Sequence, residues 1–119
     1  MYKQDWMMRQ IESMVQMISK IVFKKDLISY EVINEETYTT TDLLYKELIE
    51  LLNSYKINEA EDLLFEEIKS NDLNYLEMAI DFYSRLNKLT DEQLEEFNFS
   101  RDEIESGLKE ISEMFGLKF

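Results

Sequence analysis

The chain of 119 residues contains no proline and only two glycines, Gly107 and Gly116. These residue types interrupt helices most strongly, because proline lacks a backbone N–H donor and glycine costs about 1 kcal/mol in a helix interior. Apolar residues recur at helical spacing through most of the chain. The sequence therefore predicts an all-α fold with five or six helices. With 45% hydrophobic and 33% charged residues, we expect one globular domain, residues 1–119.

Residues 1–25 form the most regular segment and predict one long amphipathic helix. Apolar residues follow one another at steps of four, three, four and three positions, which is the spacing of a coiled-coil seam. These residues are Met7, Ile11, Met14, Ile18 and Ile21. Asp5 is a suitable N-cap, and we expect the helix to end near Lys24.

Residues 26–41 lose the helical period and predict an extended linker. Apolar and polar residues alternate over residues 28–33, and β-branched residues are frequent in the linker, which favours a short strand. An exposed strand has unpaired backbone groups, so this one could pair with its counterpart in a second copy of the chain.

Residues 42–116 predict a helical core with recognisable helix starts. The first core helix begins near Thr41. Asn58, Thr90 and Ser100 are each followed three positions later by an acid or amide, which is the pattern of a capping box. We therefore expect three further helices to begin at these residues.

The interiors of the core helices carry additional signals. The apolar stripe of the first core helix extends to Tyr55, and residues 73–88 are apolar on two sides, which predicts a central helix with several neighbours. Gly107 lies inside the last helix and indicates the close approach of a neighbouring backbone. Gly116 is placed to end that helix.

The charged residues are unevenly distributed. Residues 1–25 carry five basic and two acidic side chains, which is a net charge of +3. Because the net charge of the whole chain is −13, the other 94 residues carry −16. Most of the surface would repel phosphate, so we expect no nucleic-acid partner and no membrane surface. We interpret the acidic excess as a solvated surface, with attraction of a basic partner as the alternative. No apolar leader or spanning segment is visible, so we expect a cytoplasmic protein.

Cysteine and histidine are both absent. Their absence excludes disulfides, structural zinc sites, thiol nucleophiles, Ser-His-Asp triads and Glu-x-x-His di-iron sites. The two glycines do not cluster as phosphate-binding loops require. We expect no cofactor and no enzymatic activity.

The alternative function is a divalent-metal binder or an enzyme that uses paired carboxylates. Acidic pairs at helical spacing are frequent in so acidic a chain, and nothing in the spacing distinguishes one pair from the others. The pairs are Glu47 with Glu50, Glu92 with Glu95 or Glu96, and Glu103 with Glu66 or Glu67 if their helices meet.

The N-terminal helix supplies the candidate interface. Five of the seven methionines fall within residues 1–17, and methionine-rich surfaces adapt to the shape of a partner. The candidate residues are Trp6, Met7, Ile11, Met14, Met17, Ile18 and Ile21. Three interpretations remain open: the helix belongs to its own domain's core, forms a homodimer, or binds an unidentified protein. We expect a non-enzymatic interaction module that is a homodimer.

Two resemblances follow from particular segments. Leu44, Leu48, Leu51, Ala60 and Leu64 are placed like the core residues of a tetratricopeptide repeat, so the second and third helices resemble its antiparallel hairpin. Nearly the whole chain resembles the short form of an uncharacterised bacterial family of small helical proteins, filed as a domain of unknown function. The segments that carry this resemblance are 5–12 (DWMMRQIE), 58–67 (NEAEDLLFEE), 82–95 and 100–108 (SRDEIESGL). The resemblance implies a helical fold and no particular activity.

Overall fold

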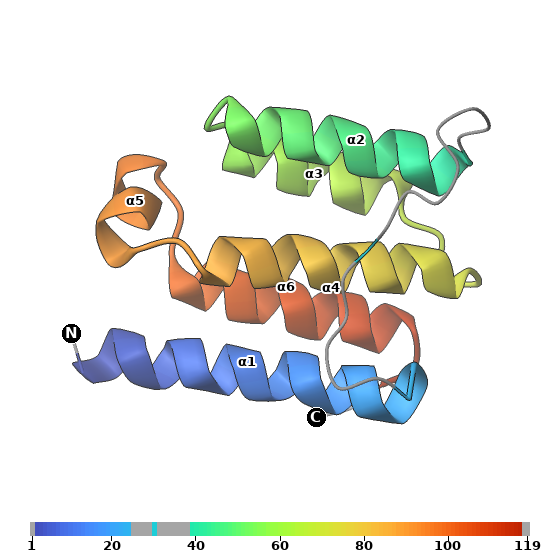
Figure 1. Ribbon diagram of the computed structural model, residues 1–119, viewed down its shortest axis with the longest axis horizontal. Helices are drawn as coiled ribbons and strands as arrows, with labels where there is room; N and C mark the ends of the chain where they lie inside the picture. The colour runs from blue at the N-terminus through green and yellow to red at the C-terminus, as the bar shows by residue number, and fades with distance from the viewer. Residues whose placement is uncertain (1, 25–29, 31–38, 118–119) are drawn as a thin grey trace.

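The computed structural model describes residues 2–24, 30 and 39–117, with side chains from residue 5 onward (Figure 1). Six helices and no strand occur in this described part, so the predicted all-α fold is confirmed. The helices are α1 (Tyr2–Val22), α2 (Thr40–Asn53), α3 (Ile57–Glu67), α4 (Leu73–Asn87), α5 (Asp91–Glu96) and α6 (Arg101–Met114). The strand predicted over residues 28–33 lies outside the described residues, apart from Tyr30.

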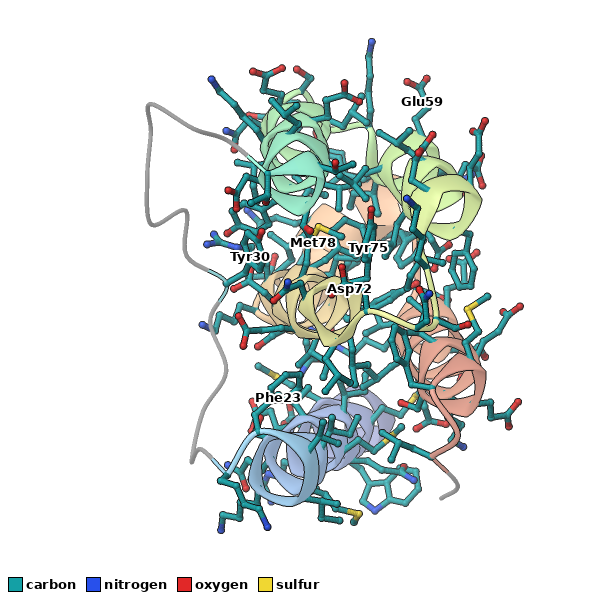
Figure 2. The ribbon with its side chains drawn as sticks, turned by 90° about the vertical axis from the view of Figure 1, so that its right-hand side faces the viewer. Phe23, Tyr30, Glu59, Asp72, Tyr75 and Met78 are labelled. Atoms are coloured by element: carbon teal, nitrogen blue, oxygen red, sulfur yellow. The ribbon has the colours of Figure 1, made fainter. Side chains whose placement is uncertain are left out.

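The long helices are stacked in three layers. Figure 1 shows α2 and α3 in the upper layer, α4 and α6 in the middle and α1 below, while the short α5 lies beyond the C-terminal end of α4. Figure 2 looks along the helices and shows the same order, with Tyr75 and Met78 between α4 and the upper layer and Glu59 on the outside. The α2–α3 pair is an antiparallel hairpin, as expected, and residues 54–56 connect its two helices.

The central helix of this arrangement is α4, as its two apolar sides predict. It contacts α1, α2 and α6, and ten of its fifteen residues are buried. One continuous hydrophobic core runs through the layers, so the helices are stabilised by shared burial more than by their individual propensities. The large side chains of α4 that are fully buried are Leu76, Met78, Ile80, Phe82, Tyr83 and Leu86.

The capping boxes of the later helices are confirmed. Thr90 with Gln93 opens α5, and Ser100 with Glu103 opens α6, with side chain and backbone exchanging hydrogen bonds in both pairs. A further box opens α2, where the cap is Thr39 and the returning side chain is Asp42. The start predicted near Thr41 is thus placed one residue too late.

Two predicted caps are wrong. Asp5 is not an N-cap, because α1 begins at Tyr2 and Asp5 lies in its first turn. Asn58 does not open a capping box, because α3 begins at Ile57. The Asn58 side chain instead donates to the carbonyl oxygen of Asn98 (3.3 Å), and the Glu61 carboxylate accepts from Tyr83 (2.6 Å). The side chains of Asn58 and Glu61, which were expected to form a capping box, therefore hydrogen-bond to residues distant in sequence instead.

Four helices are followed by a residue in the left-handed region, beginning with Lys24 (φ 58°) after α1. At the other three helix ends, the N–H of the left-handed residue and the N–H of the residue after it donate to carbonyl oxygens of the helix. Gly116 (φ 80°) ends α6, as predicted, and Asn98 (φ 57°) follows α5. The corresponding residue after α2 is Tyr55 (φ 63°), which we expected to continue the apolar stripe of that helix. Tyr55 lies beyond the end of α2 and is 67% exposed.

Candidate functional site

The inner face of α1 belongs to the domain's own core. Met7, Ile11, Met14 and Ile18 are each no more than 6% exposed, and α1 contacts α4 and α6 along this face. These four residues are part of the candidate interface, and the seam spacing runs mainly through them. The spacing therefore describes contacts within one copy of the chain, and these side chains are not accessible to a partner.

The outer face of α1 carries the other three residues of the candidate interface. Trp6 is 63%, Met17 45% and Ile21 60% exposed. At 100° per residue, Met17 lies about 20° and Ile21 about 60° around the helix from Trp6, so the three form one stripe. The exposed Ser13 lies on the same stripe between Trp6 and Met17. We call Trp6, Ser13, Met17 and Ile21 the α1 outer face.

A buried arginine fixes the position of α1 against the rest of the domain. Arg101, the first residue of α6, is 4% exposed. Its guanidinium donates to the carbonyl oxygen (2.9 Å) and side-chain oxygen (3.0 Å) of Asn87, to the carbonyl oxygen of Leu89 (2.6 Å) and to the carboxylate of Asp91 (3.1 Å). The Asn87 amide in turn donates to the carbonyl oxygen of Met8 on α1 (3.0 Å). The Arg101 guanidinium therefore connects α6 with α4 and α5 directly, and with α1 through Asn87.

Neither Arg101 nor Asn87 belongs to a pattern that marks it in the sequence. A buried charge is tolerated only when its hydrogen-bonding groups are satisfied, and here the acceptors come from residues 87–91 and are brought together by the fold. The position of Arg101 in the sequence was the one available signal, because a cation in the first turn of a helix is unfavourable beside the positive end of the helix dipole. The acceptors at Asn87, Leu89 and Asp91, in and around the loop between α4 and α5, account for an arginine at this position.

A second polar network joins Tyr30 to α2 and α4. The Tyr30 hydroxyl donates to Asp42 (2.5 Å), and its backbone N–H donates to the buried Asp81 (3.4 Å). Burial opposes ionisation of Asp42, yet hydrogen bonds from Tyr30 and Thr39 hold the pKa of this carboxyl below its usual value. Burial and the same carboxylate raise the pKa of the Tyr30 hydroxyl. Figure 2 shows Tyr30 beside α4.

The outer end of this network is an ion pair. Arg85 Nε donates to Asp81 (2.9 Å), and Arg85 Nη2 donates to the hydroxyl of Tyr45 (2.8 Å). The Tyr45 ring contacts the Tyr30 ring, with centroids 4.8 Å apart. The side chain of Asp81 is 7% exposed and that of Arg85 50%, so the arginine lies between the core and solvent.

The third polar group lies where α3, α4 and α6 meet. Tyr83 is fully buried, and its hydroxyl donates to Glu61 (2.6 Å). Burial raises the pKa of the Glu61 carboxyl, and the charges of Glu103, Asp62 and Glu110 add to this effect against the hydrogen bond from Tyr83. Burial, together with Glu61, also raises the pKa of the Tyr83 hydroxyl.

The paired carboxylates of the alternative function lie mainly on the surface. Glu47, Glu50, Glu92, Glu95 and Glu96 are exposed. The charge of Glu103 acts on Glu61, and Glu103 lines an open cleft with Glu61, Asp62 and Glu110. In the described part of the chain, no three acidic side chains are grouped so that they could hold a metal ion.

One family model matches residues 1–116, that of a family of unknown function (DUF6483). The chain belongs to the DUF6483 family. No curated protein and no solved structure matches the chain.

The expected membership of a family of unknown function is thereby confirmed, whereas the tetratricopeptide likeness of the α2–α3 hairpin stays a prediction. None of the helices described for this DUF6483 member combines the length and hydrophobicity that a membrane crossing requires. The family description assigns no chemistry to the three polar networks. Membership of the DUF6483 family therefore supplies no function for the chain.

Proposed function

We propose that the protein is a non-enzymatic interaction module that forms a homodimer through the α1 outer face. The observation that carries the proposal is the exposure of Trp6, Met17 and Ile21 in one stripe along a 21-residue helix whose opposite face is buried. Tryptophan is strongly enriched at the centres of protein interfaces because it buries a large apolar area with few rotatable bonds.

A two-fold axis perpendicular to α1 fits the positions of these side chains. Residues 6 and 21 are equally far from the midpoint between residues 13 and 14. Antiparallel helices related by an axis at this midpoint place Trp6 of each copy beside Ile21 of the other. The small Ser13 lies at the axis, where it permits a close approach of the two helices.

The charge distribution supports a second copy as the partner. Residues 1–25 carry a net charge of +3 and the remaining residues −16, so a symmetric contact through any other face would bring two acidic surfaces together. Three apolar side chains are a small contribution to the area of about 1,200–2,000 Å² that a stable dimer buries. We therefore expect a dissociation constant in the micromolar range.

Disulfide trapping tests the proposed axis directly, because the natural chain has no cysteine. A Ser13→Cys variant contains one thiol per chain, and the proposed axis places the two thiols of a dimer next to each other. We expect rapid disulfide formation under mild oxidation, measured on a non-reducing gel. Ser106→Cys is the matched control, because Ser106 is also exposed and helical but lies on α6.

Fluorescence of the single tryptophan provides an independent measurement. The emission of Trp6 should shift to shorter wavelength as protein concentration rises, in parallel with the mass from sedimentation. Ile21→Glu should abolish both changes, whereas Leu73→Glu, at an exposed apolar residue of α4, should leave them intact. A doubled mass without a shift in emission would place the interface elsewhere, and a monomer at all concentrations would contradict the proposal.

A further inference from the structure

We propose that a cleft between α2, α4 and α5 binds a small apolar carboxylate. The cleft has a volume of about 300 Å³ and lies at the C-terminal ends of α2 and α4 (Figure 1). Six of its ten lining residues are aliphatic or phenylalanine, Tyr55 adds an aromatic ring with a hydroxyl, and the other polar groups are two amides and the guanidinium of Arg85. A mainly apolar lining with a few polar groups is typical of small-molecule sites, and this volume is at the lower end of their range.

One wall of the cleft is an aromatic pair that includes the strained Tyr55. Its ring is stacked on Phe97, with centroids 4.8 Å apart and planes inclined by 22°. The left-handed backbone of Tyr55 (φ 63°) is unfavourable for a residue other than glycine. Asn98 and Gly116 hold the corresponding positions after α5 and α6 and tolerate that conformation better, whereas Lys24 (φ 58°) after α1 is, like Tyr55, a residue that adopts it less readily. The exposed Tyr55 ring, held against Phe97, supplies this wall of the cleft.

The polar end of the cleft is a positively charged donor. Arg85 uses Nε for Asp81 and Nη2 for Tyr45, and Nη1 makes no hydrogen bond to any described residue. The buried Asp81 holds the half-exposed guanidinium in place, and Arg85 lines the cleft. A planar guanidinium binds carboxylate oxygens particularly well.

The sign of the ligand charge follows from the lining. No aspartate or glutamate lines this cleft, although the protein carries 26 acidic residues. Three other clefts of the described surface each contain carboxylates: one near Asp91, one near Glu61 and one near Glu12. The cleft at Arg85 is therefore the one among these four that accepts an anionic head with an apolar body.

Titration calorimetry of the full chain with sodium octanoate tests this site. We expect saturable binding of one octanoate per chain, and no saturable binding of octylammonium, which has the same chain length and the opposite charge. Arg85→Gln should weaken octanoate binding about 10- to 100-fold, as expected for the loss of a charge-assisted hydrogen bond. Arg9→Gln, at an exposed arginine of α1, should leave the affinity unchanged.

Two further variants keep the test decisive if Arg85→Gln does not fold. Leu52→Trp fills the cleft and should abolish binding, and Tyr55→Gly removes the wall and the strained backbone together. If Tyr55 serves the cleft, Tyr55→Gly should lose octanoate while remaining folded by circular dichroism. Absence of saturable octanoate binding, equal binding of octylammonium, or full binding by Leu52→Trp would each overturn the proposal.

Discussion

At the scale of single residues, Gly107 determines how closely three helices approach. A methyl group on Gly107 of α6 would overlap the Tyr83 ring carbon that bears the hydroxyl (2.6 Å) and a carboxylate oxygen of Glu61 (2.7 Å). The sequence indicated a close approach at this residue, but the approaching groups are side chains of α3 and α4, not backbone. The missing Cβ makes room for the hydrogen bond between Tyr83 and Glu61.

We predict that Gly107→Ala destabilises the protein, although alanine is the better helix former by about 1 kcal/mol. Tyr83 is fully buried and cannot move aside, so the overlap should outweigh the gain and lower the free energy of unfolding by about 1–3 kcal/mol. Urea denaturation measures this difference. Ser106→Ala, at the exposed neighbouring position, should be neutral or slightly stabilising. An increase in stability for Gly107→Ala would show that the junction is looser than described.

Glu61 makes stability depend on pH. Because the pKa of its carboxyl is raised in the folded state, the folded protein binds a proton more tightly than the unfolded chain does. The stability from this proton is fully present below the ordinary value of 4.5 and is lost as pH rises through the folded pKa. We therefore predict that Glu61→Gln is more stable than the natural protein at pH 7 and that this advantage disappears toward pH 4.

Denaturant unfolding at several pH values measures the effect of Glu61→Gln. The exposed Glu59 on the same helix provides the control, and Glu59→Gln should show no comparable dependence on pH. Asp42 acts in the opposite direction, because the pKa of its carboxyl is lowered. Its contribution is present above the ordinary value of 3.8 and is lost as pH falls below it. An advantage of Glu61→Gln that grew toward pH 4 would contradict the assignment.

At the scale of elements, the sequence predicted most of what local rules determine. The helices, the capping boxes at Thr90 and Ser100 and the end at Gly116 depend on residues within a few positions of each other. The predicted capping box at Asn58 was wrong because Asn58 and Glu61 bind residues that are distant in sequence. These residues are Asn98 and Tyr83. Local patterns lose their predictive value where tertiary contacts compete for the same side chains.

The two faces of α1 give a prediction at the scale of this element. Met14 is 6% exposed in the core, whereas Met17 is 45% exposed on the outer face. Met14→Asp should unfold the protein or destabilise it by several kcal/mol, because it buries an unpaired carboxylate. Met17→Asp should leave the helical circular dichroism and the melting temperature nearly unchanged and should weaken the dimer. A folded Met14→Asp monomer would contradict the described position of α1.

At the scale of the whole molecule, the candidate site could be predicted only in part. The sequence assigned the candidate interface to α1, but it could not separate the exposed Trp6, Met17 and Ile21 from the four buried residues of the same helix. That separation depends on where α4 and α6 lie, which no periodicity within residues 1–25 determines. The cleft at Arg85 was missed for the same reason, since its walls come from α2, α4 and α5.

The uneven charge of the whole molecule leads to a prediction about salt. Two copies carry −13 each, so their acidic bodies repel one another even when α1 forms the contact. Salt shortens the screening length from about 30 Å at 0.01 M to about 3 Å at 1 M and leaves apolar contacts largely intact. We therefore predict that self-association strengthens as sodium chloride is raised, measured by sedimentation and by the emission of Trp6. A contact between the basic α1 of one copy and the acidic body of another would instead weaken with salt. The direction of the salt dependence thus distinguishes the symmetric dimer from head-to-tail association.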